Sequence, residues 1–357
     1  MLWVLISYAS LTKAIPHFLS GNHTIGEIYV VSQGLSHATL SSIFCLFSDT
    51  CKHKRNSSLL LGVWIVLLLL YFLHIMDAKY LKRHPQRHGI LPWLFSCVVA
   101  LALSFSNEPQ DNPVLWTLDQ LQSKSYNLLL VMYWVVMLVL FFTVLVVFQN
   151  QILHKRRNTI VRKYFHLLTV LLFVPGIYID PQFHSFAISA VLSLFVISEY
   201  VRYYRLPPFG DKMHSLMSIF VDAKDTGSAI LTHFYLLLGC ALPLIVGAPT
   251  ENLVFLLSGT LLLGVGDSMA SVIGSAYGSV FWQDGSKKSV QGTIAAFVSM
   301  VAVSTALVVW VPPKDTSLFM VTLCIFLATL FEANTSLIDN LILPIYYASL
   351  LLGLKAL

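Results

Sequence analysis

Residues 252–274 read Asn-Leu-Val-Phe-Leu-Leu-Ser-Gly-Thr-Leu-Leu-Leu-Gly-Val-Gly-Asp-Ser-Met-Ala-Ser-Val-Ile-Gly, and this stretch decides the fold class. It is apolar over the length of a membrane helix, which needs about 20 mostly apolar residues. Asp267 nevertheless stands near its end. A carboxylate inside a membrane segment costs roughly 3 kcal/mol, so such a residue is by default a candidate functional residue.

The composition of the whole chain agrees with a membrane protein. Of its 357 residues, 57% are hydrophobic and only 11% are charged. A soluble domain is about 45–50% apolar and about 25% charged. The net charge of +5 is small and lies in short loops. We therefore expect membrane lipid around the chain and no nucleic-acid polymer among its partners.

The apolar runs are long and continuous, without the alternating pattern of a membrane barrel. We predict an all-α, polytopic transmembrane helix bundle of about 10–11 helices. The predicted helices are 26–48, 58–77, 91–106, 126–148, 164–179, 184–201, 229–248, 252–272, 291–312, 317–334 and 339–355. Polar helix ends become frequent after residue 150, which separates N-terminal transmembrane helices (1–150) from a second part (151–357).

Basic loops predict the orientation of this second part. The strongest basic cluster spans 154–163, and positive loops face the cytoplasm. Counting helices from there places 202–228, 273–290 and the turn near Asp339 on the same side. The second part therefore brings several charged segments to the cytoplasmic membrane face, which we take as the catalytic face.

Two of these segments carry alternative interpretations. Arg162 and Lys163 are either an interfacial anchor that reaches the lipid headgroups or a grip for phosphate. On a helix, Arg162 shares a face with His166. Around Asp267, small residues permit close helix packing, which accounts for Ala270 and Gly274. Packing does not account for a carboxylate, whereas Mg²⁺ prefers one or two carboxylates plus substrate phosphates.

The remaining segments are a basic loop and two acids. Residues 285–293 read Gly-Ser-Lys-Lys-Ser-Val-Gln-Gly-Thr, which is not a Walker A motif. Hydrogen-bond donors and positive charge just before a helix favour the binding of phosphate. The alternative is an ordinary basic loop. Glu332 and Asp339 are predicted at the same membrane face, where Asp339 could simply cap a helix.

Four motifs in this order resemble the polyprenol kinase family, and within it the dolichol kinases. They are Arg-Lys-x-x-His from 162, Gly-x-Gly-Asp-x-x-Ala-Ser-x-x-Gly from 264, Lys-Lys-Ser-x-Gln-Gly-Thr from 287 and Asp-Asn-x-x-x-Pro from 339. The resemblance covers roughly residues 150–355. The family pattern also predicts a longer N-terminal membrane region, so this chain would begin partway into it.

The resemblance implies CTP-dependent phosphorylation of dolichol, a polyprenol lipid, to dolichyl phosphate. The product serves N-glycosylation and mannosylation. The resemblance also implies a multi-pass protein of the endoplasmic reticulum membrane with its active site facing the cytoplasm. Residues 151–357 would then be the catalytic kinase domain, with a CTP-binding loop near 282–297. CTP would be the phosphate donor and Mg²⁺ the divalent cation.

The site residues follow from the motifs and from the predicted membrane face. The candidate catalytic residues are Asp267, Lys163, Arg162, Asp339 and Glu332, with Asp267 also the candidate metal ligand. The candidate nucleotide-binding residues are Gly266, Ser271, Gly274, Lys287, Lys288, Ser289, Gln291, Gly292 and Thr293. At position 291 the family usually has Glu, so the amide of Gln291 removes a potential metal ligand or base.

Three alternative functions share some of these features. A CDP-lipid cytidylyltransferase would also use CTP and a metal ion, but its His-Gly-Gly and Asp-Arg-x-Asp signature is missing. Another lipid kinase, acting on a different polyprenol or on diacylglycerol, is closer in chemistry. A transporter is disfavoured because the acids lie at helix ends and no internal repeat stands out.

Overall fold

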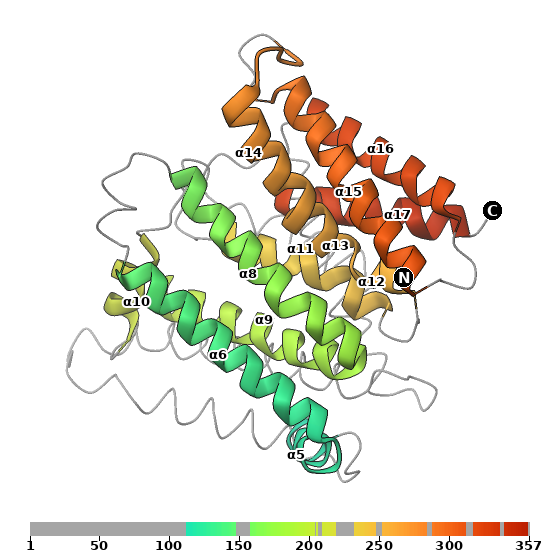
Figure 1. The fold of residues 1–357 in the computed structure, drawn as a ribbon. Coiled ribbons are helices and arrows are strands. Elements are labelled where there is room, and N and C mark those ends of the chain that lie inside the picture. Colours follow the sequence, from blue (N-terminus) through green and yellow to red (C-terminus); the bar gives the residue numbers. More distant parts are fainter. Residues whose placement is uncertain are drawn as a thin grey trace, which may run out of the picture. The chain divides into compact units, whose positions relative to one another are not determined.

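The computed structural model describes residues 112–147, 158–203, 205, 209–218, 232–247, 252–283, 288–311, 317–335 and 339–355. The elements of this part are helices, together with one isolated β-bridge (Figure 1). The all-α prediction is therefore confirmed. The stretches Ser125–Val144, Ser258–Tyr277 and Val290–Trp310 are each long and apolar enough to cross a membrane. The predicted helices 26–48, 58–77 and 91–106, and the boundary near residue 150, lie outside the described residues.

The chain divides into two compact units. The first unit comprises residues 1–124 and 189–231, and its described elements are α5 (Pro113–Ser123), the end of α9 (Pro181–Tyr203) and α10 (Gly210–Ser218). Helices α5 and α10 were not predicted, because both are too short for a membrane helix. Asn112 caps α5 by accepting hydrogen bonds from the amides of Val114 (3.0 Å) and Leu115 (3.1 Å).

The second unit comprises residues 125–188 and 232–357. It contains α6 (Ser125–Val147), α8 (Asn158–Ile179), the start of α9, α11 (Thr232–Gly247), α15 (Val290–Trp310), α16 (Leu318–Asn334) and α17 (Asp339–Lys355), besides the broken helix described below. Most of these agree with their predicted ranges to within three residues. Helix α8 begins at Asn158, six residues before its predicted start at 164, because its first turns are too polar to be recognised as a membrane helix.

Two side chains of α6 support a proline inside α8. Pro175 has no N–H to donate to the carbonyl of Leu171, four residues earlier. Tyr133 donates its hydroxyl to this carbonyl at 2.9 Å, and Trp134 donates its indole N–H to the carbonyl of Leu172 at 3.1 Å. In an apolar environment such replacement partners are what makes a helical proline tolerable. They also tie α8 to α6.

The predicted helix 252–272 is present but broken into consecutive pieces. These are α12 (Leu253–Leu256), α13 (Ser258–Thr260), the π-helix η1 (Leu261–Asp267) and α14 (Ser268–Tyr277). π-helical segments are rare and are often found at functional sites. A Cβ on Gly264 would lie 2.3 Å from Val170 of α8, and one on Gly266 would lie 2.6 Å from the Met300 sulfur of α15. The two glycines therefore let η1 approach both helices.

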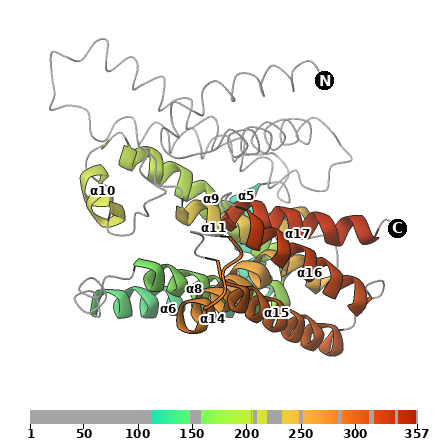
Figure 2. The same cartoon turned by 90° about the horizontal axis from the view of Figure 1, so that it is seen from above.

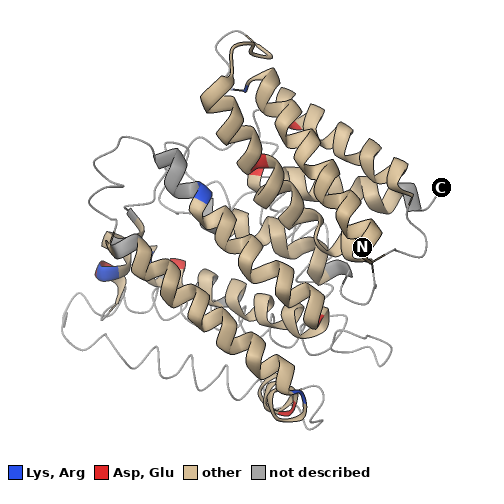
Figure 3. Cartoon of the chain, viewed as in Figure 1, with Lys and Arg blue, Asp and Glu red and all other residues tan. Residues whose placement is uncertain are grey.

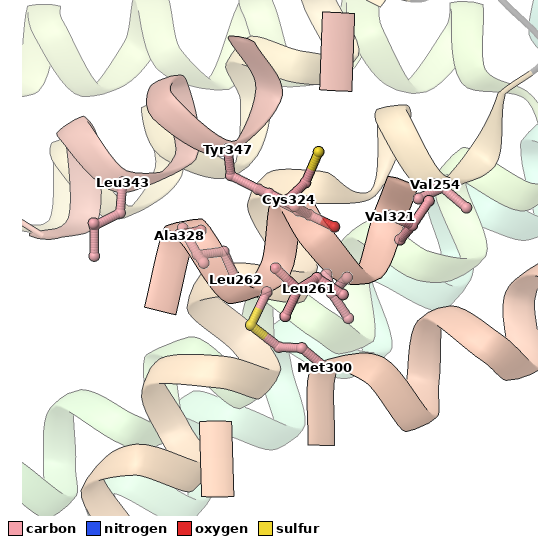
Figure 4. Packing of buried hydrophobic residues seen from close by; sticks show 10 residues of the cluster. Val254, Leu261, Leu262, Met300, Val321, Cys324, Ala328, Leu343 and Tyr347 are labelled. Carbon is pink, nitrogen blue, oxygen red and sulfur yellow. The ribbon is translucent and has the colours of Figure 1, made fainter. Parts of the chain in front are cut away.

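The core of the second unit lies beside η1. Figure 4 shows Leu261 and Leu262 of η1 packed with Met300 of α15. The same cluster includes Val254, Val321, Cys324, Ile325, Ala328, Leu343 and Tyr347, all buried. Helices α15 and α16 run side by side in Figures 1 and 2. This packing fixes the start of η1 in the core of the unit.

Two glycines form a tight junction between α11, α13 and α17. A Cβ on Gly239 of α11 would lie 2.1 Å from the carbonyl oxygen of Asn340 in α17. A Cβ on Gly259 of α13 would lie 2.2 Å from the carbonyl oxygen of Gly239. Because both obstacles are backbone atoms, no side-chain rotation can make room.

We expect Gly239→Ala and Gly259→Ala each to destabilise the protein by about 1–3 kcal/mol, because the helices must move apart. Thermal unfolding of the purified protein in detergent measures this. Gly353→Ala in α17 is the matched control, since a Cβ there meets nothing within 4 Å. Equal melting temperatures for all three variants would contradict the close approach.

Candidate active site

Asp267, at the end of η1, forms an ion pair with Lys163 of α8. The Lys163 ammonium contacts Oδ2 of the carboxylate and also donates to the Asp267 backbone carbonyl oxygen at 3.2 Å. The two side chains are 19% and 17% exposed, so the pair is largely shielded. Charged residues are sparse along these helices (Figure 3). The carboxylate is thus tolerated among apolar helices because a cation on the neighbouring helix compensates its charge.

His166 is a second partner of the same carboxylate. Its Nε2 lies 3.0 Å from Asp267 Oδ2, and its side chain is only 5% exposed. Thr169 donates its hydroxyl to the His166 backbone carbonyl at 2.7 Å. His166 ends the Arg-Lys-x-x-His motif and was expected to share a face with Arg162, but it was not among the predicted site residues. The signal was its spacing of three residues from Lys163, which places both side chains on one helix face.

Lys288 and Glu332 form a second part of this site, at the C-terminal end of α16. The Lys288 ammonium donates to the backbone carbonyl of Glu332 and, at 2.7 Å, to that of Thr335. A lysine there satisfies the free carbonyls at the end of α16 and is favoured by the helix dipole. The Glu332 carboxyl group interacts electrostatically with the charges of Asp267, Lys288, Asp339 and Lys163. The structure therefore brings these five predicted residues into one charged cluster.

Asp339 is the first residue of α17. Its Oδ1 accepts a hydrogen bond from the Asn340 amide at 3.1 Å. A carboxylate in the first turn is stabilised by the helix dipole, so a structural role accompanies its place in the cluster. Lys287 lies outside the described residues, and so does the side chain of Arg162, although its backbone belongs to α8.

Small residues pack α14 against the start of α15. Ser289 caps α15 by accepting a hydrogen bond from the Gly292 amide at 3.2 Å. A Cβ on Gly292 would lie 2.7 Å from the Ala270 carbonyl oxygen, and one on Gly274 would lie 2.9 Å from Ser289 Oγ. Close packing therefore explains Gly292, and it explains Gly274 as predicted. At Ala270 it is the backbone carbonyl that lies at this contact.

The other predicted nucleotide-binding residues lie on the same elements. Gly266 is buried within η1, and Ser271 is half-buried on α14. Thr293 of α15 accepts a hydrogen bond from the Trp282 indole at 2.9 Å. Gln291 contacts the loop that follows α14. The whole predicted loop region, as far as it is described, is thus held against α15.

Comparison with known proteins places the chain in a family. The dolichol kinase family model matches residues 1–309. Dolichol kinase EVAN of Arabidopsis thaliana is 31% identical over 98% of this chain and 68% of its own length, and human dolichol kinase is 34% identical over 99% and 69%. Dolichol kinase of Saccharomyces cerevisiae is 29% identical over 71% of this chain and 49% of its own. No solved structure matches. This helical membrane protein therefore belongs to the dolichol kinase family.

The ion pair at Asp267 predicts coupled effects on stability. Lys163→Met should destabilise the protein by about 1–3 kcal/mol, because it leaves a shielded carboxylate without its cation. Adding Asp267→Asn should recover part of this loss. The double variant should therefore lose less stability than the two single variants lose together.

Thermal unfolding in detergent of the wild type, both single variants and the double variant measures this coupling. Lys212→Met, at an exposed position of α10, serves as the matched control and should melt close to the wild type. Strictly additive single effects would show that Lys163 and Asp267 do not interact.

Proposed function

We propose that this chain transfers the γ-phosphate of CTP to the hydroxyl group of dolichol. Family membership supports the kinase activity and the lipid substrate. The single observation that carries the chemistry is the shielded carboxylate of Asp267 with Lys163 and His166 on one of its oxygens. The product, dolichyl phosphate, would then supply N-glycosylation and mannosylation at the endoplasmic reticulum membrane.

Cations of the cluster would bind the phosphates of CTP. Phosphoryl transfer requires mostly positioning and neutralisation of charge on the transferred group. Lys163 and Lys288 are described at the site, and Arg162 and Lys287 are their sequence neighbours. We propose that these four residues neutralise the triphosphate at the cytoplasmic membrane face.

The donor set is compatible with Mg²⁺. The described residues contain no group of three or more side chains suited to a metal ion. Mg²⁺ does not need one, because it takes one or two carboxylates and completes its shell with water and substrate phosphates. Asp267 is the residue that would hold it, and when bound the ion would supply charge neutralisation at the phosphate oxygens.

The lipid hydroxyl would reach this site from the bilayer. Exposed apolar side chains suited to lipid contact lie on two helices next to Asp267. They are Leu167 and Leu171 on α8, which carries Lys163, and Val272 on α14, which follows Asp267 in the sequence. The hydroxyl oxygen forms a bond to the γ-phosphorus as the bond to the bridging oxygen breaks and CDP leaves. Glu332 and Asp339 are the candidates to accept the hydroxyl proton.

We expect Asp267→Asn to lower the transfer of γ-labelled phosphate from CTP to dolichol by a factor of about 10²–10³, the typical loss for a key electrostatic group. The assay uses microsomes that express each variant at matched levels. Asp211→Asn is the control, because its side chain is 80% exposed and exposed ion pairs contribute little.

Near-normal transfer by Asp267→Asn would contradict the catalytic role of Asp267.

The mass of the lipid product distinguishes a kinase from a CDP-lipid cytidylyltransferase, since a kinase adds phosphate whereas a cytidylyltransferase adds CMP.

Removal of divalent cations should abolish the transfer. Chelation with EDTA in the same microsomes is expected to lower the rate to background, and added Mg²⁺ should restore it, because few protein ligands retain the ion without substrate phosphates. Full activity in excess EDTA would rule out a metal-dependent mechanism.

A further inference from the structure

The described residues on the two sides of 284–287 pair with each other next to α14 and α15. An isolated antiparallel β-bridge joins Phe281 to Ser289, and we refer to residues 278–283 as the first strand of this pairing and to residues 288–290 as the second. The Trp282 amide donates to the Lys288 carbonyl at 3.2 Å, and the Val290 amide donates to the Val280 carbonyl at 2.8 Å. We call residues 278–283 and 288–290 the α14–α15 hairpin.

Gln291, in the first turn of α15, holds the first strand of this hairpin with both ends of its amide. Its Oε1 accepts hydrogen bonds from the backbone amides of Ser279 and Val280, each at 3.3 Å. Its Nε2 donates to the Ser279 hydroxyl at 2.6 Å. Because backbone amides only donate, these contacts also determine which end of the side-chain amide is the oxygen.

The contacts of Gln291 connect it to the charged cluster. The strand that it holds is bonded to Lys288 through Trp282, and Lys288 donates to the carbonyl of Glu332. The Trp282 indole is in turn fixed to Thr293 of α15 at 2.9 Å. A displacement of the first strand would therefore move Lys288 relative to Glu332.

We propose that Gln291 is a positioning residue that fixes the α14–α15 hairpin, and through it Lys288, and that position 291 does not bind the metal ion. The side-chain oxygen is already used by two backbone amides. A glutamate at this position could accept the same two hydrogen bonds, with the Ser279 hydroxyl turning to donate to it. The positioning role thus needs only an acceptor oxygen at position 291, which an amide or a carboxylate can supply.

Hydrogen exchange at the amides of Ser279 and Val280 is the first test, and it needs no substrate. Gln291→Leu should speed their exchange by about tenfold, because both amides lose their acceptor. Gln291→Glu should retain the protection. Gln182→Leu, at an exposed position of α9, is the matched control and should leave these amides as in the wild type.

Kinetics provide the second test, which rests on the proposed function. Gln291→Leu should raise the KM for CTP by about threefold or more while kcat changes less, as expected for impaired positioning of a binding group. In Gln291→Glu, the Mg²⁺ concentration for half-maximal rate should stay within about twofold of the wild type, because no metal ligand is added.

Two results would overturn the proposal. One is unchanged exchange at both amides in Gln291→Leu, which would remove the positioning role. The other is a several-fold lower Mg²⁺ requirement in Gln291→Glu, which would make position 291 a metal ligand. If the wild type itself transfers no phosphate, the proposed function fails, whereas the exchange experiment still decides the role of Gln291.

Discussion

The interaction on which the site depends is the pairing of Asp267 with Lys163 and His166. A carboxylate in an apolar helix bundle is costly unless a cation and hydrogen-bond donors compensate it. Both partners come from one face of α8 and converge on a single oxygen of the carboxylate. The acid and the cation to which we assign the proposed phosphoryl transfer are therefore held together by the fold itself, as electrostatic preorganisation would require.

Backbone approach keeps this pairing in place. Gly264 lets η1 lie against α8, and Gly266 lets it lie against α15, where a methyl group would collide in either case. Pro175 leaves the carbonyl of Leu171 without a backbone donor, and the hydroxyl of Tyr133 donates to it instead. Helix α8 is therefore anchored to α6 on the C-terminal side of Lys163. The charged residues are thus positioned by the packing of the helices that carry them.

The sequence predicted the class of fold and most helices of the second unit, because long apolar runs identify membrane helices without regard to their packing. It also indicated the small-residue contact of Ala270 and Gly274 with α15. It could not indicate η1, since a π-helix depends on tertiary packing and the apolar pattern of Leu261–Asp267 fits an α-helix equally well. The sequence also could not predict the contacts of Lys288 and Gln291, because these contacts join segments whose distance in space depends on the fold. The roles of the site residues stay predictions.

The most direct measurement of the central claim is complementation of cells that lack their own dolichol kinase. The 357-residue chain and its Asp267→Asn variant are expressed at equal levels in these cells, and dolichyl phosphate is measured. The account predicts that only the wild-type chain restores dolichyl phosphate. Restoration by both chains would contradict the role of Asp267, and restoration by neither would contradict the proposed activity.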